Sequence, residues 1–280
     1  MIEALLSHQA TVRLGGFACI FAAMAFWELL APRRKQAFRR SRRWPSNLGV
    51  VVIDTLLVRL AFPTTAVGVA LLAEQHGWGL FHVLNMPVWL TVVAAVILLD
   101  LAIYFQHVLF HAVPALWRLH RMHHADLDFD VTTGVRFHPV EILLSMGIKL
   151  GVIAGLGAPA VAVLIFEVLL NATSMFNHGN VRLPDRVDRL LRLLVVTPDM
   201  HRVHHSVLPR ETNSNFGFNL PWWDRLFGTY RAAPAAGQEA MTIGIEQFRD
   251  PRELGLGHML TQPFRGDDRL YPLGRGEQAE

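Results

Sequence analysis

The amino-acid sequence predicts an all-α integral membrane protein with about four to five transmembrane helices, capped by a cytoplasmic, histidine-rich helical domain. Three observations support this fold class. Hydrophobic residues make up 52% of the 280-residue chain and charged residues 18%, whereas a typical soluble domain has about 25% charged residues. Apolar stretches long enough to cross a bilayer recur along the chain. The 14 histidines are concentrated in short clusters after these stretches.

Five apolar stretches are expected to form the membrane part. The first, residues 12–31, has about the length that crosses a bilayer core, and Pro32 and a basic run at 33–43 end it. No basic segment precedes it and no small-residue cleavage site follows it, so we expect a retained span and not a signal peptide. The other four stretches are residues 48–73, 87–106, 140–156 and 160–177.

The sequence GLGAP at 155–159 predicts a tight turn between the last two stretches. In an antiparallel hairpin centred near Ala158, Lys149 and Glu167 lie at the same depth. Charged side chains inside a bilayer usually pair, so we expect these two to face each other. The same register brings His138 together with His178 at the cytoplasmic mouth of the hairpin.

The basic run RRKQAFRRSRR at 33–43 predicts the orientation of the chain. Cytoplasmic loops of membrane proteins are enriched in Lys and Arg, so the N-terminus is expected outside. Alternating spans then bring every histidine cluster to the cytoplasmic side. The run directly follows an apolar helix and has no interleaved stacking aromatics, so we interpret it as a topology signal and expect no nucleic-acid partner.

The spacing of the histidines predicts a metal site. Residues three and four apart share one face of a helix, and the pattern H-x-x-H-H occurs twice, at 120–124 and 201–205. His107 and His111 form a further pair with helical spacing. Neutral imidazole is the commonest metal ligand in proteins. Because Cys19 is the only cysteine, a thiolate-bound iron–sulfur cluster is excluded, and the ligands must be nitrogen and oxygen atoms.

The ordered motifs HVLFH, HRMHH, RFHP, FNHGN and TPDMHRVHH, followed by NFGFNLPWWDRLFGTY, resemble the fatty acid hydroxylase and sterol desaturase superfamily. The resemblance covers about residues 45–232. It implies a bundle of transmembrane helices with a dinuclear iron centre that uses O2 to oxidise C–H bonds of lipids. Carried over by position, the metal ligands would be His107, His111, His120, His123, His124, His138, His178, His201, His204 and His205.

This resemblance divides the chain into three parts. Residues 1–45 are expected to form the first transmembrane helix and a basic cytoplasmic loop, residues 46–232 the catalytic domain, and residues 233–280 a polar cytoplasmic tail. The expected enzyme hydroxylates or desaturates a membrane lipid, which could be a fatty acyl chain, a sterol or hopanoid, an ether lipid or a carotenoid. With one cysteine and no GxGxxG fingerprint, its electrons must come from a separate donor, a reductase with ferredoxin or cytochrome.

The alternative hypothesis is a histidine-rich metal-binding membrane protein without oxygenase activity, either a transporter or a metal-dependent hydrolase. A transporter is expected to place its polar ligands near the bilayer midplane. The predicted clusters lie instead at and beyond one end of the helices, which favours the oxygenase.

Several residues near the histidines have less specific interpretations. Asp126, Asp128 and Asp130 alternate with apolar residues after the second motif, and we expect solvated acids there and not metal ligands. Asp100 is about 10 Å along the helix axis from His107, so a role in helix packing is expected. Trp222 and Trp223 could line a lipid entrance or anchor the chain at the interface. Pro198 and Asp199 suggest a helix start.

Overall fold

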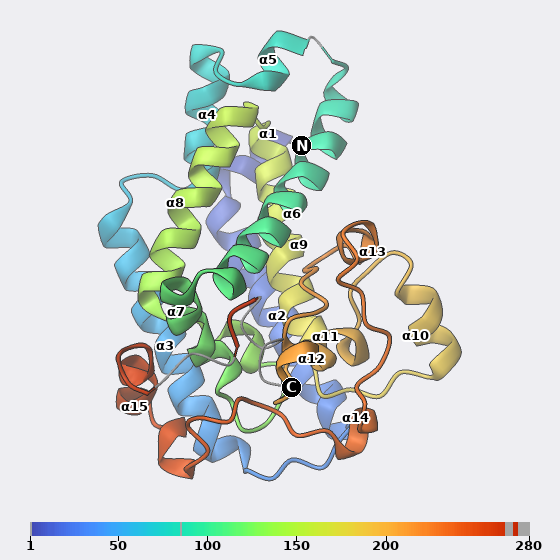
Figure 1. Ribbon diagram of the computed structural model, residues 1–280. Helices are drawn as coiled ribbons and strands as arrows, with labels where there is room; N and C mark the ends of the chain where they lie inside the picture. The colour runs from blue at the N-terminus through green and yellow to red at the C-terminus, as the bar shows by residue number, and fades with distance from the viewer. Residues whose placement is uncertain (1, 85, 267–270, 274–280) are drawn as a thin grey trace.

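The computed structural model describes residues 2–84, 86–266 and 271–273, and within them it is helical throughout (Figure 1). Two isolated bridges, Pro32 with Val181 and Ser206 with Ile243, are the β pairings in this described part. The helices are α1 (Ile2–Ser7), α2 (Gln9–Leu30), α3 (Arg40–Ala61), α4 (Ala66–His76), α5 (Leu80–Leu84), α6 (Val88–Ala112), α7 (Pro114–His124), η1 (Thr133–Val135), α8 (Pro139–Leu156), α9 (Ala160–Asn177), α10 (Asp185–Leu191), α11 (Pro198–His204), α12 (Pro209–Thr212), α13 (Trp222–Leu226), α14 (Gly237–Ala240), η2 (Pro251–Leu254), α15 (Leu256–Thr261) and η3 (Gln262–Phe264).

Five segments are long and apolar enough to cross a membrane, which confirms the predicted fold class. They are α2, the segment Arg40–Leu84 that holds α3 to α5, and the helices α6, α8 and α9. Helix α9 is the centre of the bundle and packs against α2, α4 and α6. Half of its apolar window is buried, compared with 6% for α2. Helix α2 therefore leaves most of its apolar surface available to lipid.

The second apolar stretch forms two helices because it contains Pro63. Helix α3 ends at Ala61, two residues before this proline, which has no backbone N–H for a continuing helix. Helix α4 begins after Thr65, whose hydroxyl accepts a hydrogen bond from the backbone N–H of Gly68 at 3.1 Å. The span therefore crosses the bundle in two pieces, with α3 nearer the histidines (Figure 1).

Helices α8 and α9 form the predicted hairpin. Gly157 ends α8 with a φ of +63°, and a Cβ at this position would lie 2.2 Å from the backbone oxygen of Trp78, so only glycine fits the turn. The predicted pairing inside the membrane is confirmed, since Lys149 Nζ lies 2.7 Å from Glu167 Oε1. The other carboxylate oxygen of Glu167 lies 2.8 Å from Arg13 Nη1 on α2, a contact that the hairpin argument did not predict.

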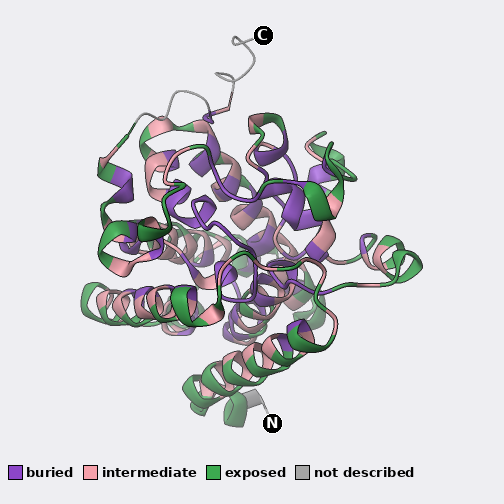
Figure 2. Ribbon diagram, turned by 90° about the horizontal axis from the view of Figure 1, so that it is seen from below, coloured by how far each residue is buried: buried purple, intermediate pink, exposed green. Residues whose placement is uncertain are grey.

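The shorter helices α7 and α10 to α15 gather at one end of the bundle (Figure 1). Viewed from this end, the buried residues are concentrated at its centre (Figure 2). The C-terminal segment packs onto it, with Met241, Ile243 and Met259 buried. Tyr271 stacks on Trp117 with ring centroids 5.4 Å apart. Residues 237–264 thus cover the histidine-bearing end of the molecule.

Candidate metal centre

Nine of the ten predicted histidines come together at this end in two groups. Each histidine contributes one ring nitrogen, and within a group these nitrogens all lie within 4.8 Å of one another. All nine side chains are buried. We call them the five-histidine group, which is His107, His111, His120, His124 and His204, and the four-histidine group, which is His123, His178, His201 and His205.

Local helix geometry explains how the side chains reach these positions. His107 and His111 lie one turn apart at the end of α6, so the membrane helix itself carries two members of the five-histidine group. Each H-x-x-H-H triplet contributes to both groups. On α7, which begins with Pro114 at its first position, His120 and His124 belong to one group and His123 to the other. Each triplet therefore holds a histidine of one group next to a histidine of the other.

Helix α11 begins as expected near Pro198. The N-cap is Thr197, whose hydroxyl accepts a hydrogen bond from the backbone N–H of Met200, and Asp199 lies in the first turn. A negatively charged side chain in the first turn interacts favourably with the positive end of the helix dipole. The cap therefore fixes the start of the short helix that presents the second triplet.

The nitrogen atoms in the four-histidine group have the spacing of ligands around one ion. Nε2 of His178 lies 3.2 Å from Nε2 of His123, 3.1 Å from that of His201 and 3.2 Å from that of His205. Imidazole nitrogens bind transition metals at about 2.1 Å, so two of them at right angles lie about 3.0 Å apart. The observed separations are close to this value.

Hydrogen bonds from Nδ1 orient most of the rings. His107 donates to the carbonyl oxygen of Phe216 at 2.8 Å, and His120 donates to the carboxylate of Glu141 at 2.7 Å. Because each acceptor is an oxygen atom, Nδ1 carries the proton and the Nε2 lone pair is free for a metal. The same arrangement holds for His111 with the side-chain oxygen of Asn213, His123 with the carbonyl of Arg136, His178 with that of Ser174 and His204 with that of Ser214.

Four ring nitrogens of the five-histidine group are buried with no hydrogen-bond partner among the described residues. These are Nε2 of His111, Nε2 of His204 and both ring nitrogens of His124. A buried nitrogen without a partner costs about 1–3 kcal/mol, and a metal ion at the centre of the group would satisfy one nitrogen of each of the three rings. The residues present therefore fit two metal ions, one in each group.

Burial keeps the imidazoles neutral, which is the form that binds a metal. It lowers the pKa of His120 and the pKa of His178 to about 3. Burial, followed by the neighbouring histidines, also lowers the pKa of His123 and of His201 well below the usual value. At neutral pH, protons therefore do not compete with a metal for these rings.

His138 belongs to neither group, so the expectation that it binds metal beside His178 is corrected. Its Nδ1 accepts a hydrogen bond from the backbone N–H of Val140 at 3.2 Å, which caps the start of α8. Its Nε2 lies 3.2 Å from the carbonyl oxygen of Leu260, to which it donates. Both ring nitrogens are therefore occupied by hydrogen bonds to backbone atoms.

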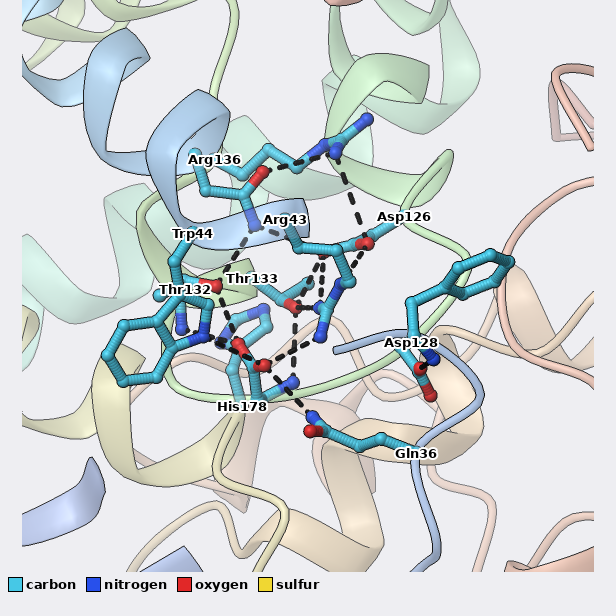
Figure 3. Close-up of polar contacts among 12 residues, drawn as sticks. Gln36, Arg43, Trp44, Asp126, Asp128, Thr132, Thr133, Arg136 and His178 are labelled. Atoms are coloured by element: carbon cyan, nitrogen blue, oxygen red, sulfur yellow. Dashed lines mark hydrogen bonds and ion pairs between the residues drawn. The ribbon is translucent and has the colours of Figure 1, made fainter. Parts of the chain in front are cut away.

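Asp126, Asp128 and Asp130 are buried, so the prediction of solvated acids is wrong (Figure 3). Arg43, which is fully buried, binds Asp126 with two nitrogens at 2.9 and 2.7 Å and Asp130 at 2.6 Å. Asp128 accepts a hydrogen bond from the backbone N–H of Phe38 at 2.8 Å. The loop after the second motif is therefore folded around an arginine from the start of α3.

The charge of this network is balanced inside the protein. Burial alone would raise the pKa of Asp126, but the guanidinium groups of Arg43 and Arg136 outweigh it and lower the pKa to about 2. Arg136 also carries the carbonyl oxygen that orients His123. The ion pairs thus help to hold the loop that positions one histidine of the site.

Asp100 organises the loop after α12, in agreement with a packing role. It accepts hydrogen bonds from the backbone N–H groups of Asn219 and Leu220, both at 3.2 Å, and from the indole of Trp223 at 2.8 Å. Trp223 is buried, so neither of its expected roles fits. Trp222 is 42% exposed and donates to the carbonyl oxygen of Leu193.

Sequence reasoning missed Glu141 and Asp224. Glu141 lies on α8 and holds His120. Asp224 accepts hydrogen bonds from the backbone N–H groups of Phe216 and Gly217, at 2.7 and 2.8 Å, and Phe216 supplies the carbonyl that orients His107. Both carboxylates act on the site through contacts far apart in the chain, so no local spacing identifies them.

A cavity of about 420 Å³ leads from the histidines into the helix bundle. Its wall includes His107, His120 and His123, so it touches both groups. Apolar side chains from all five spans and several polar side chains line the remainder. A cavity of this size suits part of a lipid molecule.

The fold and the site define a class of protein, a multi-span helical membrane enzyme with a buried histidine cluster suited to metal ions. The fatty acid hydroxylase family model matches residues 92–229, which are 138 of the 280 residues. Together with the relatives below, this match supports a membrane lipid hydroxylase. No solved structure matches the chain.

Three relatives illustrate the family. An ornithine lipid hydroxylase of Rhizobium tropici is 29% identical over 263 residues, which cover 91% of this chain and 76% of the relative. The alkylglycerol monooxygenase of Homo sapiens is 25% identical, over 66% of this chain and 40% of its own length. The cholesterol 25-hydroxylase of Rattus norvegicus is 29% identical, over 56% of this chain and 53% of its own length. All three are named for oxygenation of lipids.

Proposed function

We propose that the protein is a di-iron monooxygenase that uses O2 and external electrons to hydroxylate a polar membrane lipid. The observation that carries this proposal is that two groups of neutral, buried histidines meet at the wall of one cavity within the membrane bundle. The relatives named as hydroxylases and monooxygenases support hydroxylation over desaturation.

In this proposal the five-histidine group holds one iron and the four-histidine group holds the other. Nitrogen ligands suit iron, and two irons can share the electrons that the reaction needs. When bound, the metal pair supplies the activation of O2 for insertion of an oxygen atom into a C–H bond. The Nδ1 hydrogen bonds of the rings fix their orientation, so the site is organised before the lipid binds.

The protein itself would hold the lipid in position and exclude water from the site. The apolar wall, with Val58, Ile103 and Met146, would hold the aliphatic part of a lipid beside His107, His120 and His123. Shielding by the covering C-terminal segment and by Trp117 would keep bulk water away from the reacting carbon.

Two parts of the proposal concern the surroundings of the enzyme. We propose that the histidines lie on the cytoplasmic side, and the basic residues at 33–43, which lie at the same end of the bundle, support this orientation (Figure 1). A separate reductase with ferredoxin or cytochrome is proposed as the electron donor, and it would approach the histidine-bearing end.

Metal analysis of the purified full-length protein tests the ligand assignment. We expect two irons per chain. His111→Ala in the five-histidine group and His201→Ala in the four-histidine group should each lower the content to one iron or less and abolish hydroxylation. With ¹⁸O2 and an electron donor, the wild type should place the heavy isotope in a lipid hydroxyl group.

His76→Ala is the matched control, because His76 is an exposed residue of α4 outside both groups. It should keep both irons and full activity. Unchanged iron in both His111→Ala and His201→Ala would refute the ligand assignment. Lipid turnover by the zinc-loaded protein without O2 or reductant would favour the hydrolase alternative.

A further inference from the structure

An acidic side chain without a partner faces the cavity from the membrane. Asp54 lies on α3, within the second apolar span, and is 8% exposed. It lines the cavity, and its Oδ1 atom has no hydrogen-bond partner among the described residues. An ionisable residue inside a membrane span is costly, which indicates a function that requires it.

A second carboxyl group, that of Glu141, lines the same cavity as Asp54. Glu141 uses Oε1 to accept the hydrogen bond from His120, whereas its Oε2 is buried without a partner in the described part of the chain. Both residues line the cavity, so two carboxyl oxygens that lack a hydrogen-bond partner in the described part of the chain belong to one space. Two carboxylates that share one site disfavour each other's charged form, and a cation between them removes this cost.

The cations of the cavity lie farther from the histidines. Lys149 is eight residues beyond Glu141 on α8, a rise of about 12 Å, and Arg59 is five residues beyond Asp54 on α3, about 8 Å. Lys149 and Arg13 share the single carboxylate of Glu167, which leaves a positive excess there. The acidic groups Asp54 and Glu141 of the cavity therefore lie nearer the histidines than its basic groups do. A positively charged group of a ligand is attracted to the inner end.

We propose that the substrate is an amine-bearing lipid whose ammonium group binds Asp54, with Glu141 as its second contact. This inference rests on the proposed function, because it names the substrate class of the same cavity. The ammonium would supply the hydrogen bonds that Asp54 Oδ1 and Glu141 Oε2 lack. It would also place the carbons next to the amine near His107 and His120, and those carbons are the ones oxidised. An uncharged lipid such as a sterol offers Asp54 a hydroxyl donor but no counter-charge.

Binding of two matched probes tests this assignment. The first is N-dodecanoyl-1,4-diaminobutane, which carries a free amine that is protonated at pH 7.5. The second is the same molecule with that amine acetylated. Both are titrated calorimetrically into the as-purified, metal-containing full-length protein in detergent, without reductant. We expect the wild type to bind the cationic probe at least tenfold more tightly than the neutral one.

Asp54→Asn keeps the size of the side chain and breaks no hydrogen bond of the described structure. It should reduce the preference for the cationic probe to less than twofold, while the neutral probe binds as before. Glu74→Gln is the control, because Glu74 is an acid of α4 outside the cavity. Glutamine can still accept the hydrogen bond that Glu74 takes from the backbone N–H of Ala160. This variant should keep the full preference.

Equal binding of both probes by the wild type, or a tenfold preference retained by Asp54→Asn, would overturn the inference. If Asp54→Asn does not purify as a folded protein, Asp54→Ser is titrated in its place with the same expectation. The titration involves no turnover, so its result is independent of the oxygenase test. A protein that binds the amine but hydroxylates nothing would refute the proposed function and keep this site.

Discussion

Arg43 is the side chain on which the buried acidic loop depends most. It pairs with both Asp126 and Asp130, and replacing it with methionine would leave Asp130 without this ion pair and Asp126 with only the more distant Arg136, at 4.0 Å. Removing one partner of a buried ion pair costs about 3–5 kcal/mol. We therefore expect Arg43→Met to lower the unfolding temperature sharply and to release iron. The exposed neighbour Arg42, changed to methionine, should have little effect on either measurement.

Glu141 is expected to tune the metal through His120. Glu141→Gln keeps an oxygen acceptor for Nδ1 of His120 but removes the charge. Changes to groups that orient metal ligands typically cost 10–100-fold in metal affinity. Competition with a chelator should therefore remove iron from the five-histidine group at about 10-fold lower chelator concentration than in the wild type. Equal iron retention would show that the charge of Glu141 does not influence the metal.

Residues whose partners are near in sequence could be predicted, and residues with distant partners could not. The helical spacing of His120, His123 and His124 depends only on local geometry, and these rings do converge. Asp126 is paired with Arg43, 83 residues earlier. Alternation with apolar residues looks the same in a solvated loop and in a buried one. His138 fits a family motif, but its position at a helix start directs its ring to backbone atoms.

At the scale of elements, the turn between α8 and α9 depends on Gly157. An alanine there must adopt a positive φ, which costs about 1–2 kcal/mol, and its Cβ would collide with the backbone of Trp78. We expect Gly157→Ala to lower the unfolding temperature and to weaken the contact of Lys149 with Glu167.

Gly155→Ala is the matched control for this prediction. Gly155 lies inside α8, and a Cβ there meets no atom within 4 Å. It should leave the stability unchanged or raise it by up to about 1 kcal/mol, because alanine favours helix. Equal unfolding temperatures for the two variants would contradict the argument from turn geometry.

The sequence predicted the spans better than their interruptions. Length and apolar composition locate all five spans, because lipid requires uninterrupted apolar helices. The break between α3 and α4 follows from Pro63, yet an apolar stretch with one proline can also form a kinked single helix. The segment 237–264 has no apolar run, so its packing over the histidines could not be predicted from its composition.

For the whole molecule, the orientation in the membrane gives a direct test. In a Cys19→Ser background, single cysteines at the exposed positions Arg42 and Arg186 should react with an impermeant reagent only from the cytoplasmic face. A cysteine at Gln75, at the other end of the bundle, should react only from the opposite face. Labelling of positions 42 and 186 from different faces would contradict the five-span arrangement.

Helix α6 runs without interruption from Val88 to Ala112 and carries His107 and His111 in its last two turns. The histidine cluster is therefore rigidly attached to a rod whose depth is set by the thickness of the surrounding hydrocarbon. A lipid that is held at its polar end meets the metal site at a fixed distance from that end. The position of the oxidised carbon is then fixed relative to the head group. Lengthening the acyl chain should therefore leave the position of the new hydroxyl unchanged.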